Sequence, residues 1–304
     1  MKKVLVIGST VVDVVINLPH LPTTGEDVNV QSQSMSLGGC AYNVFAAARH
    51  FQVPALLFSP VGTGTYGDYV RRRLARQGIV SPIPTPDLDN GCCYCFVEDS
   101  GERTFICHHG AEYLFQEEWF SLLNLEEFDS VYLCGLEVEE ATGDNLIAFL
   151  ERNPRLQIYF APGPRIAQIP AGRMERLLDL GPVLHLNEEE SIAASGAETV
   201  EAAAECLSRR TGSSVVVTLG ARGAYVWDGG AGALVGGVKA RQVDTIGAGD
   251  AHAGAMIACR QMGCSLVEAV ARANRVAAAV VEVQGALLPE ERFRSLDLPV
   301  WRGE

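Results

Sequence analysis

The segment Asp244-Thr245-Ile246-Gly247-Ala248-Gly249-Asp250 places two carboxylates around a turn of small residues, and a helix is expected directly after it. The first turn of a helix has unpaired N–H groups and the positive end of the helix dipole, so it binds anions. Gly247 and Gly249 allow an anion to approach the backbone closely. A carboxylate beside such a site is unfavourable unless it accepts a proton from an attacking hydroxyl, which predicts Asp250 as a general base in phosphate transfer. A simple N-cap role would explain neither the glycines nor Asp244.

A second segment, Gly38-Gly39-Cys40-Ala41-Tyr42-Asn43, carries polar groups suited to hydroxyls. Its diglycine leads into a predicted helix and leaves Asn43 one turn inside that helix, where the amide offers both a donor and an acceptor. Asp13 follows the first predicted strand and can accept two vicinal hydroxyls. Taken alone, a diglycine before a helix is usually an ordinary turn. A polyol-binding site at 38–43 is therefore a hypothesis, which requires that the fold place residues 244–250 close to it.

Apolar runs of strand length alternate with segments of helical period for most of the chain, which predicts an α/β protein with a largely parallel, buried sheet. The predicted strands cover 3–9, 55–59, 130–134, 157–161, 183–186 and 214–218. The predicted helices cover 41–51, 68–77, 144–151 and 198–211, and a capping box at 265–268 predicts a further long helix.

Two stretches, at about 13–36 and 90–107, break this alternation. Asp99-Ser100-Gly101 lies between β-rich runs and predicts a hairpin in the second stretch. Both stretches are expected to form a small β-sheet that projects from the main domain as a lid, and the glycine-rich residues 228–237 are expected to connect another hairpin. No linker or composition shift divides the chain, so residues 1–304 are expected to form a single α/β domain.

Composition narrows the class of protein. The formal net charge of −13 argues against nucleic acid or an anionic membrane surface as the main partner. Apolar runs are far shorter than the ~20 residues of a membrane-spanning helix, and the N-terminal run reads as a strand, not a secretory leader. The nine cysteines are scattered without zinc-binding spacing, which predicts reduced thiols in a cytoplasmic protein.

The D-T-x-G-A-G-D form of residues 244–250, with Gly38-Gly39 and Asn43 about two hundred residues earlier, resembles both signatures of the ribokinase family of carbohydrate kinases, which are related to the minor phosphofructokinase. The resemblance covers most of the chain and is strongest to uncharacterised bacterial sugar kinases. It implies a Rossmann-like α/β domain with a β-sheet lid, ATP at the C-terminal half and sugar beneath the lid. It also implies ATP-dependent phosphorylation of a sugar hydroxymethyl group, with Asp250 as base and the 247–249 backbone as anion hole.

The resemblance also assigns roles to further positions. Asn187 and Glu190 match an N-x-x-E motif that positions Mg²⁺ and phosphates, although an acidic helix start is an ordinary feature. Asp244 and the carbonyl of Ile246 resemble part of a monovalent-cation site, so activation by K⁺ is expected. The positions assigned to ATP are Asn187, Thr218, Gly220, Gly223, Thr245, Gly247, Gly249 and Asn274, and the anion hole is assigned to Gly247, Ala248 and Gly249. The positions assigned to the sugar are Asp13, Gly38, Gly39, Asn43, Glu137, Arg165 and Asp250.

The chain departs from the family pattern at several places. His252 replaces a usual phenylalanine, Ala161 stands where an acid is frequent, and Gly64 replaces the aspartate of a frequent G-x-D. A surface salt bridge is an equal alternative for Arg165. These departures leave the acceptor open among pentoses, hexoses, sugar acids and nucleosides such as pseudouridine. Unpaired lid edges seek partners, so a homodimer through the lid is also expected.

Two other classes of protein compete with a kinase. Residues 62–67 satisfy G-x-G-x-x-G between a predicted strand and helix, as in NAD-dependent oxidoreductases, but Pro82, Pro84 and Pro86 occupy the region where the second strand and its acid should lie. A non-catalytic sugar-binding protein on the same scaffold would have lost the base or the anion hole, and both are present. A kinase is therefore the preferred interpretation.

Overall fold

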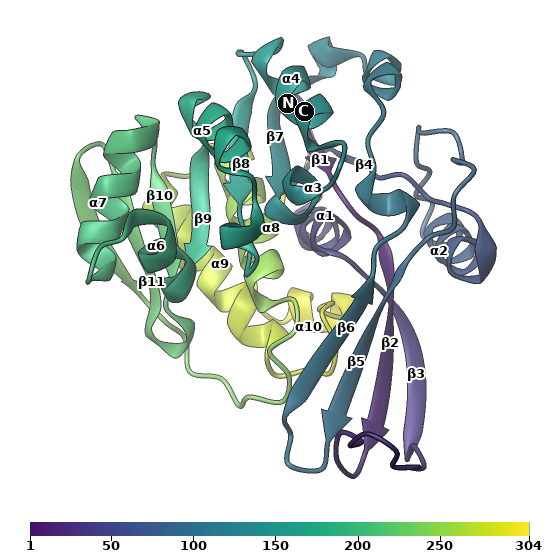
Figure 1. The fold of residues 1–304 in the computed structure, drawn as a ribbon. Coiled ribbons are helices and arrows are strands. Elements are labelled where there is room, and N and C mark those ends of the chain that lie inside the picture. The colour runs from purple at the N-terminus through teal and green to yellow at the C-terminus, as the bar shows by residue number, and fades with distance from the viewer. Residues whose placement is uncertain (304) are drawn as a thin grey trace.

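The apolar runs of the sequence become the strands of a central sheet in the computed structural model, which describes residues 1–303 (Figure 1). Across those residues the sheet has the order β12-β11-β10-β9-β8-β7-β1-β4. Its parallel strands are β4 (Ala55–Phe58), β1 (Lys3–Ile7), β7 (Phe128–Cys134), β8 (Gln157–Ala161), β9 (Val183–Asn187) and β10 (Val215–Thr218). Antiparallel β11 (Gly223–Asp228) and β12 (Ala231–Gly236) extend one edge.

Helices cover both faces of this sheet, because alternate residues of its strands are apolar on both sides. In β1, Val4 and Val6 enter one core while Leu5 and Ile7 enter the other. The first core packs α1 (Cys40–His50), α2 (Gly64–Arg76), α8 (Ala248–Gln261), α9 (Leu266–Val280) and α10 (Glu290–Arg294). The opposite side carries α3 (Gly135–Glu139), α4 (Gly143–Glu151), α5 (Ala171–Asp179), α6 (Glu188–Ser195) and α7 (Val200–Thr211).

A second, smaller sheet projects from the body below the central sheet (Figure 1). Its order is β3 (Ser32–Gly38), β2 (Val11–Leu18), β5 (Cys92–Glu98) and β6 (Arg103–His108). The pairs β3–β2 and β5–β6 are antiparallel, whereas β2–β5 is parallel. Each hairpin leaves the body and returns to it, so the sheet forms a flap over the carboxyl ends of the central strands. We call this sheet the lid.

The mostly parallel sheet with flanking helices and a separate small sheet confirms the predicted fold class. The predicted turn at Asp99-Ser100-Gly101 connects β5 and β6, and the capping box at Ser265 and Glu268 begins α9. The prediction for 228–237 was right about a hairpin but wrong about its extent, since 231–236 form strand β12 and the turn is Gly229-Gly230. Helix α5 and the short α3 and α10 were not predicted. None of the helices within residues 1–303 has the length and apolar character that crossing a bilayer requires.

Short 3-10 helices complete the connections. They are η1 (Ala111–Tyr113), η2 (Glu117–Leu122), η3 (Leu125–Glu127), η4 (Ile166–Gln168) and η5 (Gly220–Arg222). Helix η1 matters for the lid, because Glu112 accepts hydrogen bonds from the backbone N–H groups of Gly91 (2.8 Å) and Gly110 (3.0 Å). These two glycines flank the β5–β6 hairpin, so one buried carboxylate holds both ends of that hairpin to the body.

Candidate active site

Helix α8 begins with free backbone donors. Gly247 is its N-cap with φ +73°, and a Cβ there would lie 2.5 Å from that of Ala286, so glycine is required. Helical hydrogen bonding starts at Ala251, whose N–H donates to the Gly247 carbonyl at 2.8 Å. Within residues 1–303, the N–H groups of Gly249 and Asp250 find no acceptor. Two donors at the positive end of the helix are thus available to an anion.

Gly249 differs from Gly247 because its surroundings are open. It is exposed, and an added Cβ would meet no atom of residues 1–303 within 4 Å. The room for a ligand therefore lies directly over the free N–H groups. The prediction of an anion site at 247–249 rests on this combination of free donors and open space.

Asp250 is joined to the second predicted segment across 207 positions of sequence. Asn43 Nδ2 donates to Asp250 Oδ2 at 2.9 Å. Gly254 permits this contact, because a Cβ there would come within 2.3 Å of the Val44 carbonyl oxygen, so α1 and α8 can cross closely only with glycine. Burial raises the pKa of Asp250 to about 6, while the hydrogen bonds from Asn43 and Cys40 oppose the rise. A carboxylate with such a pKa suits a general base near neutral pH.

Asp13 lies on β2 of the lid and is seated over Gly38. A Cβ at Gly38 would lie only 1.9 Å from Asp13 Oδ2, so glycine makes the space for this carboxylate. Burial raises the pKa of Asp13 to about 7, and the negative charges of Cys107 and Asp250 add to the rise. Asp13 also lines a cavity of about 350 Å³ between the lid and the loop that contains Asp244. The lid thus places the Asp13 carboxylate, which can accept hydrogen bonds from hydroxyl groups, near the candidate base Asp250.

Both carboxylate oxygens of Asp244 accept hydrogen bonds from protein donors. Its Oδ1 accepts from Arg103 Nη1 at 2.6 Å and from the Ile246 N–H at 2.8 Å, and its Oδ2 accepts from the Gly285 N–H at 2.9 Å. Arg103 lies on β6, so this ion pair ties the lid to the loop before α8. Thr245 is exposed beside it. The expected cation contact of Asp244 and Ile246 stays a prediction, and Arg103 is a residue that sequence reasoning missed.

Glu137 is buried behind the turn that follows β1. Its Oε1 accepts from the Ser9 N–H at 2.7 Å, and Gly8 is needed there because a Cβ would lie 2.9 Å from that oxygen. Its Oε2 has no hydrogen-bond partner among residues 1–303. Burial raises the pKa of Glu137 to about 7. The unpaired oxygen is consistent with the predicted sugar contact, which stays a prediction.

Four of the residues predicted for the nucleotide lie at the carboxyl ends of β9 and β10, where open α/β sheets bind ligands: Asn187, Thr218, Gly220 and Gly223. Asn187 caps α6 in a capping box, since its Oδ1 accepts from the Glu190 N–H (2.8 Å) and its own N–H donates to the Glu190 carboxylate (3.0 Å). Glu190 lies near enough to Asp250 for its charge to raise the pKa of that base. Thr218 ends β10, and the turn from Gly220 to Gly223 follows it.

Two predicted site residues lie apart from this group. Arg165 pairs with Glu139 through two hydrogen bonds, as in the salt-bridge alternative. Asn274 is buried, accepts from His252 at 3.1 Å, and donates to the carbonyls of Val235 and Gly236. Its amide hydrogens are therefore already used, and its contact with adenine stays a prediction.

His252, one of the departures from the family pattern, has a polar role. Its Nδ1 forms a hydrogen bond with His185 Nε2 at 2.8 Å, which connects α8 to β9. Asn274 extends this series of hydrogen bonds from His252 to the backbone of β12. Burial lowers the pKa of His252 to about 3 and that of His185 to about 4, so both rings are neutral at physiological pH. A buried series of hydrogen-bonded side chains thus replaces the expected aromatic packing.

The glycines of the G-x-G-x-x-G segment pack closely against protein backbone. A Cβ at Gly62 would lie 2.3 Å from the Leu88 carbonyl, and one at Gly67 would lie 1.9 Å from the Gly62 carbonyl. The Gly62 N–H donates to Asn90 Oδ1 at 2.9 Å. The glycines are needed for the connection between α2 and the lid, which removes the main argument for a dinucleotide-binding oxidoreductase.

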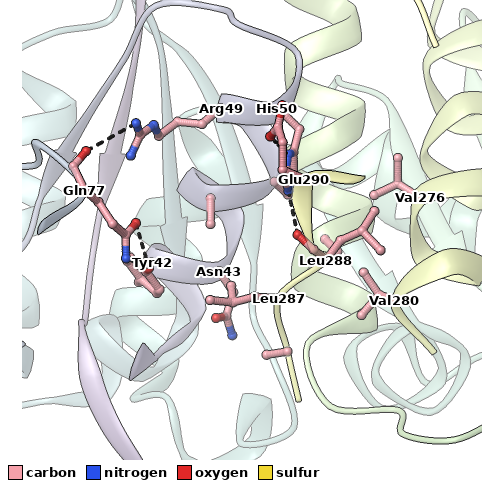
Figure 2. Close-up of a pocket in the computed structure, with 14 residues that line it drawn as sticks. Tyr42, Asn43, Arg49, His50, Gln77, Val276, Val280, Leu287, Leu288 and Glu290 are labelled. Carbon is pink, nitrogen blue, oxygen red and sulfur yellow. Dashed lines mark hydrogen bonds and ion pairs between the residues drawn. The ribbon is translucent and has the colours of Figure 1, made fainter. Parts of the chain in front are cut away.

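A second cavity, of about 380 Å³, lies between α1, α9 and the segment before α10 (Figure 2). Hydrogen bonds fix its rim, from the Gln77 amide to Tyr42 Oη (2.8 Å) and between His50 Nε2 and the Leu288 carbonyl (2.9 Å). Asn43 lines this cavity as well as bonding Asp250, and Leu287 lines both cavities. The 286–288 segment therefore lies between this second cavity and the one beneath the lid.

Comparison with known proteins identifies the family. Residues 1–292 match the pfkB family of carbohydrate kinases. The chain is 31% identical over 288 residues to the uncharacterized sugar kinase YegV of Escherichia coli K12, covering 93% of this chain and 90% of YegV. It is 26% identical over 292 residues to the ribokinase of Haemophilus influenzae, covering 94% of each chain. The crystal structure of ribokinase from Thermotoga maritima superposes with a TM-score of 0.83 at 24% identity, covering 97% of this chain and 99% of that one.

An α/β sheet whose strand ends carry a lid and a helix start with free backbone N–H groups is the architecture of a phosphotransferase of the ribokinase type. The protein belongs to the pfkB family of carbohydrate kinases, and it is an ATP-dependent carbohydrate kinase.

Gly249→Ala is expected to separate activity from stability. The added methyl group meets open space, so the melting temperature should stay constant or rise slightly. The same methyl group would hold a phosphate away from the free N–H groups, and one lost oxyanion donor is worth about 3 kcal/mol, or ~10²-fold in kcat. Gly172→Ala is the matched control, because Gly172 is also the second residue of a helix with open surroundings. Full activity of Gly249→Ala would contradict the anion site.

Proposed function

We propose that this kinase transfers phosphate to a hydroxymethyl group of a free sugar, with Asp250 as the base. The observation that carries the proposal is the Asn43–Asp250 hydrogen bond at the start of α8, next to two N–H groups without acceptors in residues 1–303. One carboxylate is thereby held where it can take a proton, and the donors beside it can neutralise a phosphoryl group in transfer.

We propose that Asp13 orients the acceptor. Its carboxylate can accept two sugar hydroxyls at once, and hydrogen bonds to a charged acceptor are the stronger ones. Asn43, which follows Gly38 and Gly39 in sequence, keeps a buried Oδ1 without a partner among residues 1–303 while its Nδ2 bonds Asp250. Glu137 supports the turn after β1. The sugar is thereby fixed with its hydroxymethyl oxygen toward Asp250, and the lid excludes water.

The chain also fits a nucleoside triphosphate and its magnesium ion. The donors at 247–249 suit polyphosphate, and Asn187, Glu190, Thr218 and the 220–223 turn lie at the adjacent strand ends. ATP with Mg²⁺ supplies the phosphoryl group and neutralises its charge. Glu190 is proposed to hold Mg²⁺, directly or through water. K⁺ is proposed to bind near Asp244 and the Ile246 carbonyl.

A sugar acceptor is favoured over a nucleoside because of the relatives. The Haemophilus influenzae protein, similar over nearly its full length, is named a ribokinase. A nucleoside such as pseudouridine is the second candidate, since the cavity of about 350 Å³ also admits an attached ring.

We propose a cytoplasmic location and a homodimer through the lid. All nine cysteines are free within the described residues, as in a reducing compartment. The lid edge β6 exposes Phe105 (52%) and Ile106 (55%), and an exposed apolar edge strand favours pairing with a second copy. The net charge of −13 disfavours nucleic acid and anionic membranes as partners.

The deciding experiment measures ADP formation with ATP·Mg²⁺ across pentoses, hexoses, sugar acids and nucleosides, with and without K⁺. We expect a saturating response to one neutral sugar, with phosphate on its hydroxymethyl group by NMR. A best response to a nucleoside would replace the sugar proposal, and no response to any polyol would overturn both.

The pH dependence of kcat/KM should show the ionisation of two carboxyl groups. For kcat/KM toward the sugar, both Asp13 and Asp250 must be ionised, so the value should fall as pH drops through about 7 and about 6. Below these values the slope should approach two, a ~100-fold loss per pH unit. In Asp13→Asn, only Asp250 remains and the slope should be one. A slope unchanged by this substitution would contradict the role of Asp13.

A further inference from the structure

Two cysteines of the lid stand directly opposite each other. Cys93 on β5 and Cys107 on β6 are register partners in an antiparallel pair, and their Sγ atoms are 3.3 Å apart. Opposed residues in antiparallel strands have Cα atoms about 4.5–5.5 Å apart, within the range of about 4.4–6.8 Å that a disulfide accepts. From this register and the 3.3 Å separation, we expect side-chain rotation to bring the sulfurs to bonding distance.

Cys107 has the surroundings of a reactive thiol. It is exposed, and His109 lies on the same strand side with its Nδ1 bonded to the Glu140 carboxylate. His109 also stacks on Tyr113, with ring centroids 4.0 Å apart. The hydrogen bond from Cys93 and the His109 ring lower the pKa of Cys107 to about 5, and the Cys107 sulfur raises the pKa of His109 to about 9. A thiolate beside an imidazolium held by a carboxylate is the arrangement that makes cysteines nucleophilic.

The pair lies in one row with Asp13. Cys93 is the register partner of Asp13 in the parallel β2–β5 pair, and partners in a ladder project to the same face. The alternate residues Val15, Cys95 and Phe105 of the same strands line the cavity between lid and body. The negative charge of Cys107 is one cause of the raised pKa of Asp13. A change at Cys107 therefore reaches the residue proposed to bind the sugar.

We propose that Cys93 and Cys107 are a peroxide-reactive thiol pair, in which Cys107 is oxidised first and Cys93 then closes a disulfide across the inner face of the lid. The Cys107 thiolate attacks one peroxide oxygen, the O–O bond breaks, and the departing hydroxide takes up a proton to become water. The Cys93 sulfur attacks the resulting sulfenic acid, forms the S–S bond and releases a second water. The two thiols lose two electrons, which the peroxide gains, and an external dithiol returns them.

This oxidation also affects the sugar site, a consequence that rests on the proposed function. The disulfide is neutral, so it removes a negative charge beside Asp13. Asp250 is then the remaining anionic neighbour of Asp13. Cys93 does not change this charge count, because it is a neutral thiol before oxidation and part of the neutral disulfide afterwards. Asp13 is then ionised in a larger fraction of molecules at neutral pH, and the KM for the sugar should fall by about twofold or more while the KM for ATP is unchanged.

The first test is chemical and does not depend on kinase activity. The purified full-length chain is treated with hydrogen peroxide, its free thiols are alkylated, and its peptides are analysed by mass spectrometry. We expect one intramolecular link, Cys93 to Cys107, that dithiothreitol reverses. Cys206→Ser is the control, because Cys206 lies on α7 away from the lid, and it should behave as the parent does. A link to Cys92 or Cys95, or between molecules, would overturn the proposal.

Single variants separate the roles of the two thiols. Cys93→Ser should leave Cys107 as a sulfenic acid that dimedone traps, and Cys107→Ser should form no link. At pH 7 iodoacetamide should modify Cys107 about tenfold faster than Cys206, and His109→Gln should remove most of that difference. Equal rates for the two cysteines would overturn the assignment of Cys107 as the reactive thiol. A disulfide that leaves the sugar KM unchanged would overturn the coupling to Asp13, but not the proposed kinase.

Discussion

Asp250→Asn is expected to lower kcat by ~10²-fold or more, the usual loss on removal of a general base. The amide cannot take the hydroxyl proton, while its oxygen can still accept the hydrogen bond from Asn43 that holds the side chain in place. The KM values for sugar and ATP should therefore change little. The measurement is initial rate at saturating substrates, with Asp68→Asn on the exposed side of α2 as the matched control. Turnover near the parent value in a folded variant would reject Asp250 as base.

The same substitution should stabilise the fold at high pH. Because the folded chain raises the pKa of Asp250 from 3.8 to about 6, it binds the proton more tightly than the unfolded chain does. Stability from this group is full below about pH 4, falls as pH rises to about 6, and stays low above that value. Asparagine carries no charge, so Asp250→Asn should raise the free energy of unfolding by about 1–2 kcal/mol at pH 8 and have little effect at pH 4. Urea unfolding at the two pH values measures this difference.

Local signals made much of the architecture predictable. Apolar runs fixed the parallel strands, and the capping box at Ser265 and Glu268 located α9, because the groups that form it lie within one helical turn. The start of α8 was also predictable, since Gly247 and Gly249 are typical of a turn directly before a helix. That Asn43 and Asp250 belong to one site was implied only by the family resemblance, and their direct hydrogen bond was not predicted, because nothing local indicates that α1 crosses α8 at Gly254.

Contacts set by strand register and by packing between distant segments were not predictable. The Arg103–Asp244 ion pair joins residues 141 positions apart, and either charge alone reads as a surface residue. The Cys93–Cys107 pair depends on the register of β5 against β6, which a shift of one residue would separate. Glu112 appears in the sequence as an ordinary acid, and its hold on Gly91 and Gly110 is evident only in three dimensions.

The role of His252 shows the same limit. From sequence it is a polar residue in place of an aromatic one, and its effect on packing could not be judged. In the fold it bonds His185 and Asn274, so the change is compensated by two other polar residues on β9 and α9. Buried polar groups are tolerated when all of them find partners. A departure at one position thus has to be interpreted with the residues it contacts.

Gly38→Ala is expected to weaken productive sugar binding strongly, with little change in the nucleotide site. The new Cβ would lie 1.9 Å from Asp13 Oδ2, so the carboxylate must move away from the position where it meets the sugar. Loss of hydrogen bonds to a charged acceptor, at about 1.5–3 kcal/mol each, should lower kcat/KM for the sugar by ~10²-fold or more. The KM for ATP, measured at high sugar concentration, should remain within about twofold, since Gly38 lies on the lid side of the cavity.

A double-mutant cycle with Asp13→Ala distinguishes this mechanism from general misfolding. Overpacking at Gly38 should cost about 1–3 kcal/mol of stability in the single variant. In the variant that combines Gly38→Ala with Asp13→Ala, the colliding side chain is absent, so the melting temperature should recover while sugar binding stays lost. Gly236→Ala is the matched control, because Gly236 also ends a strand and its surroundings are open. If the double variant is no more stable than Gly38→Ala alone, the collision with Asp13 does not cause the loss of stability. The placement of the Asp13 carboxylate against Gly38 would then be wrong.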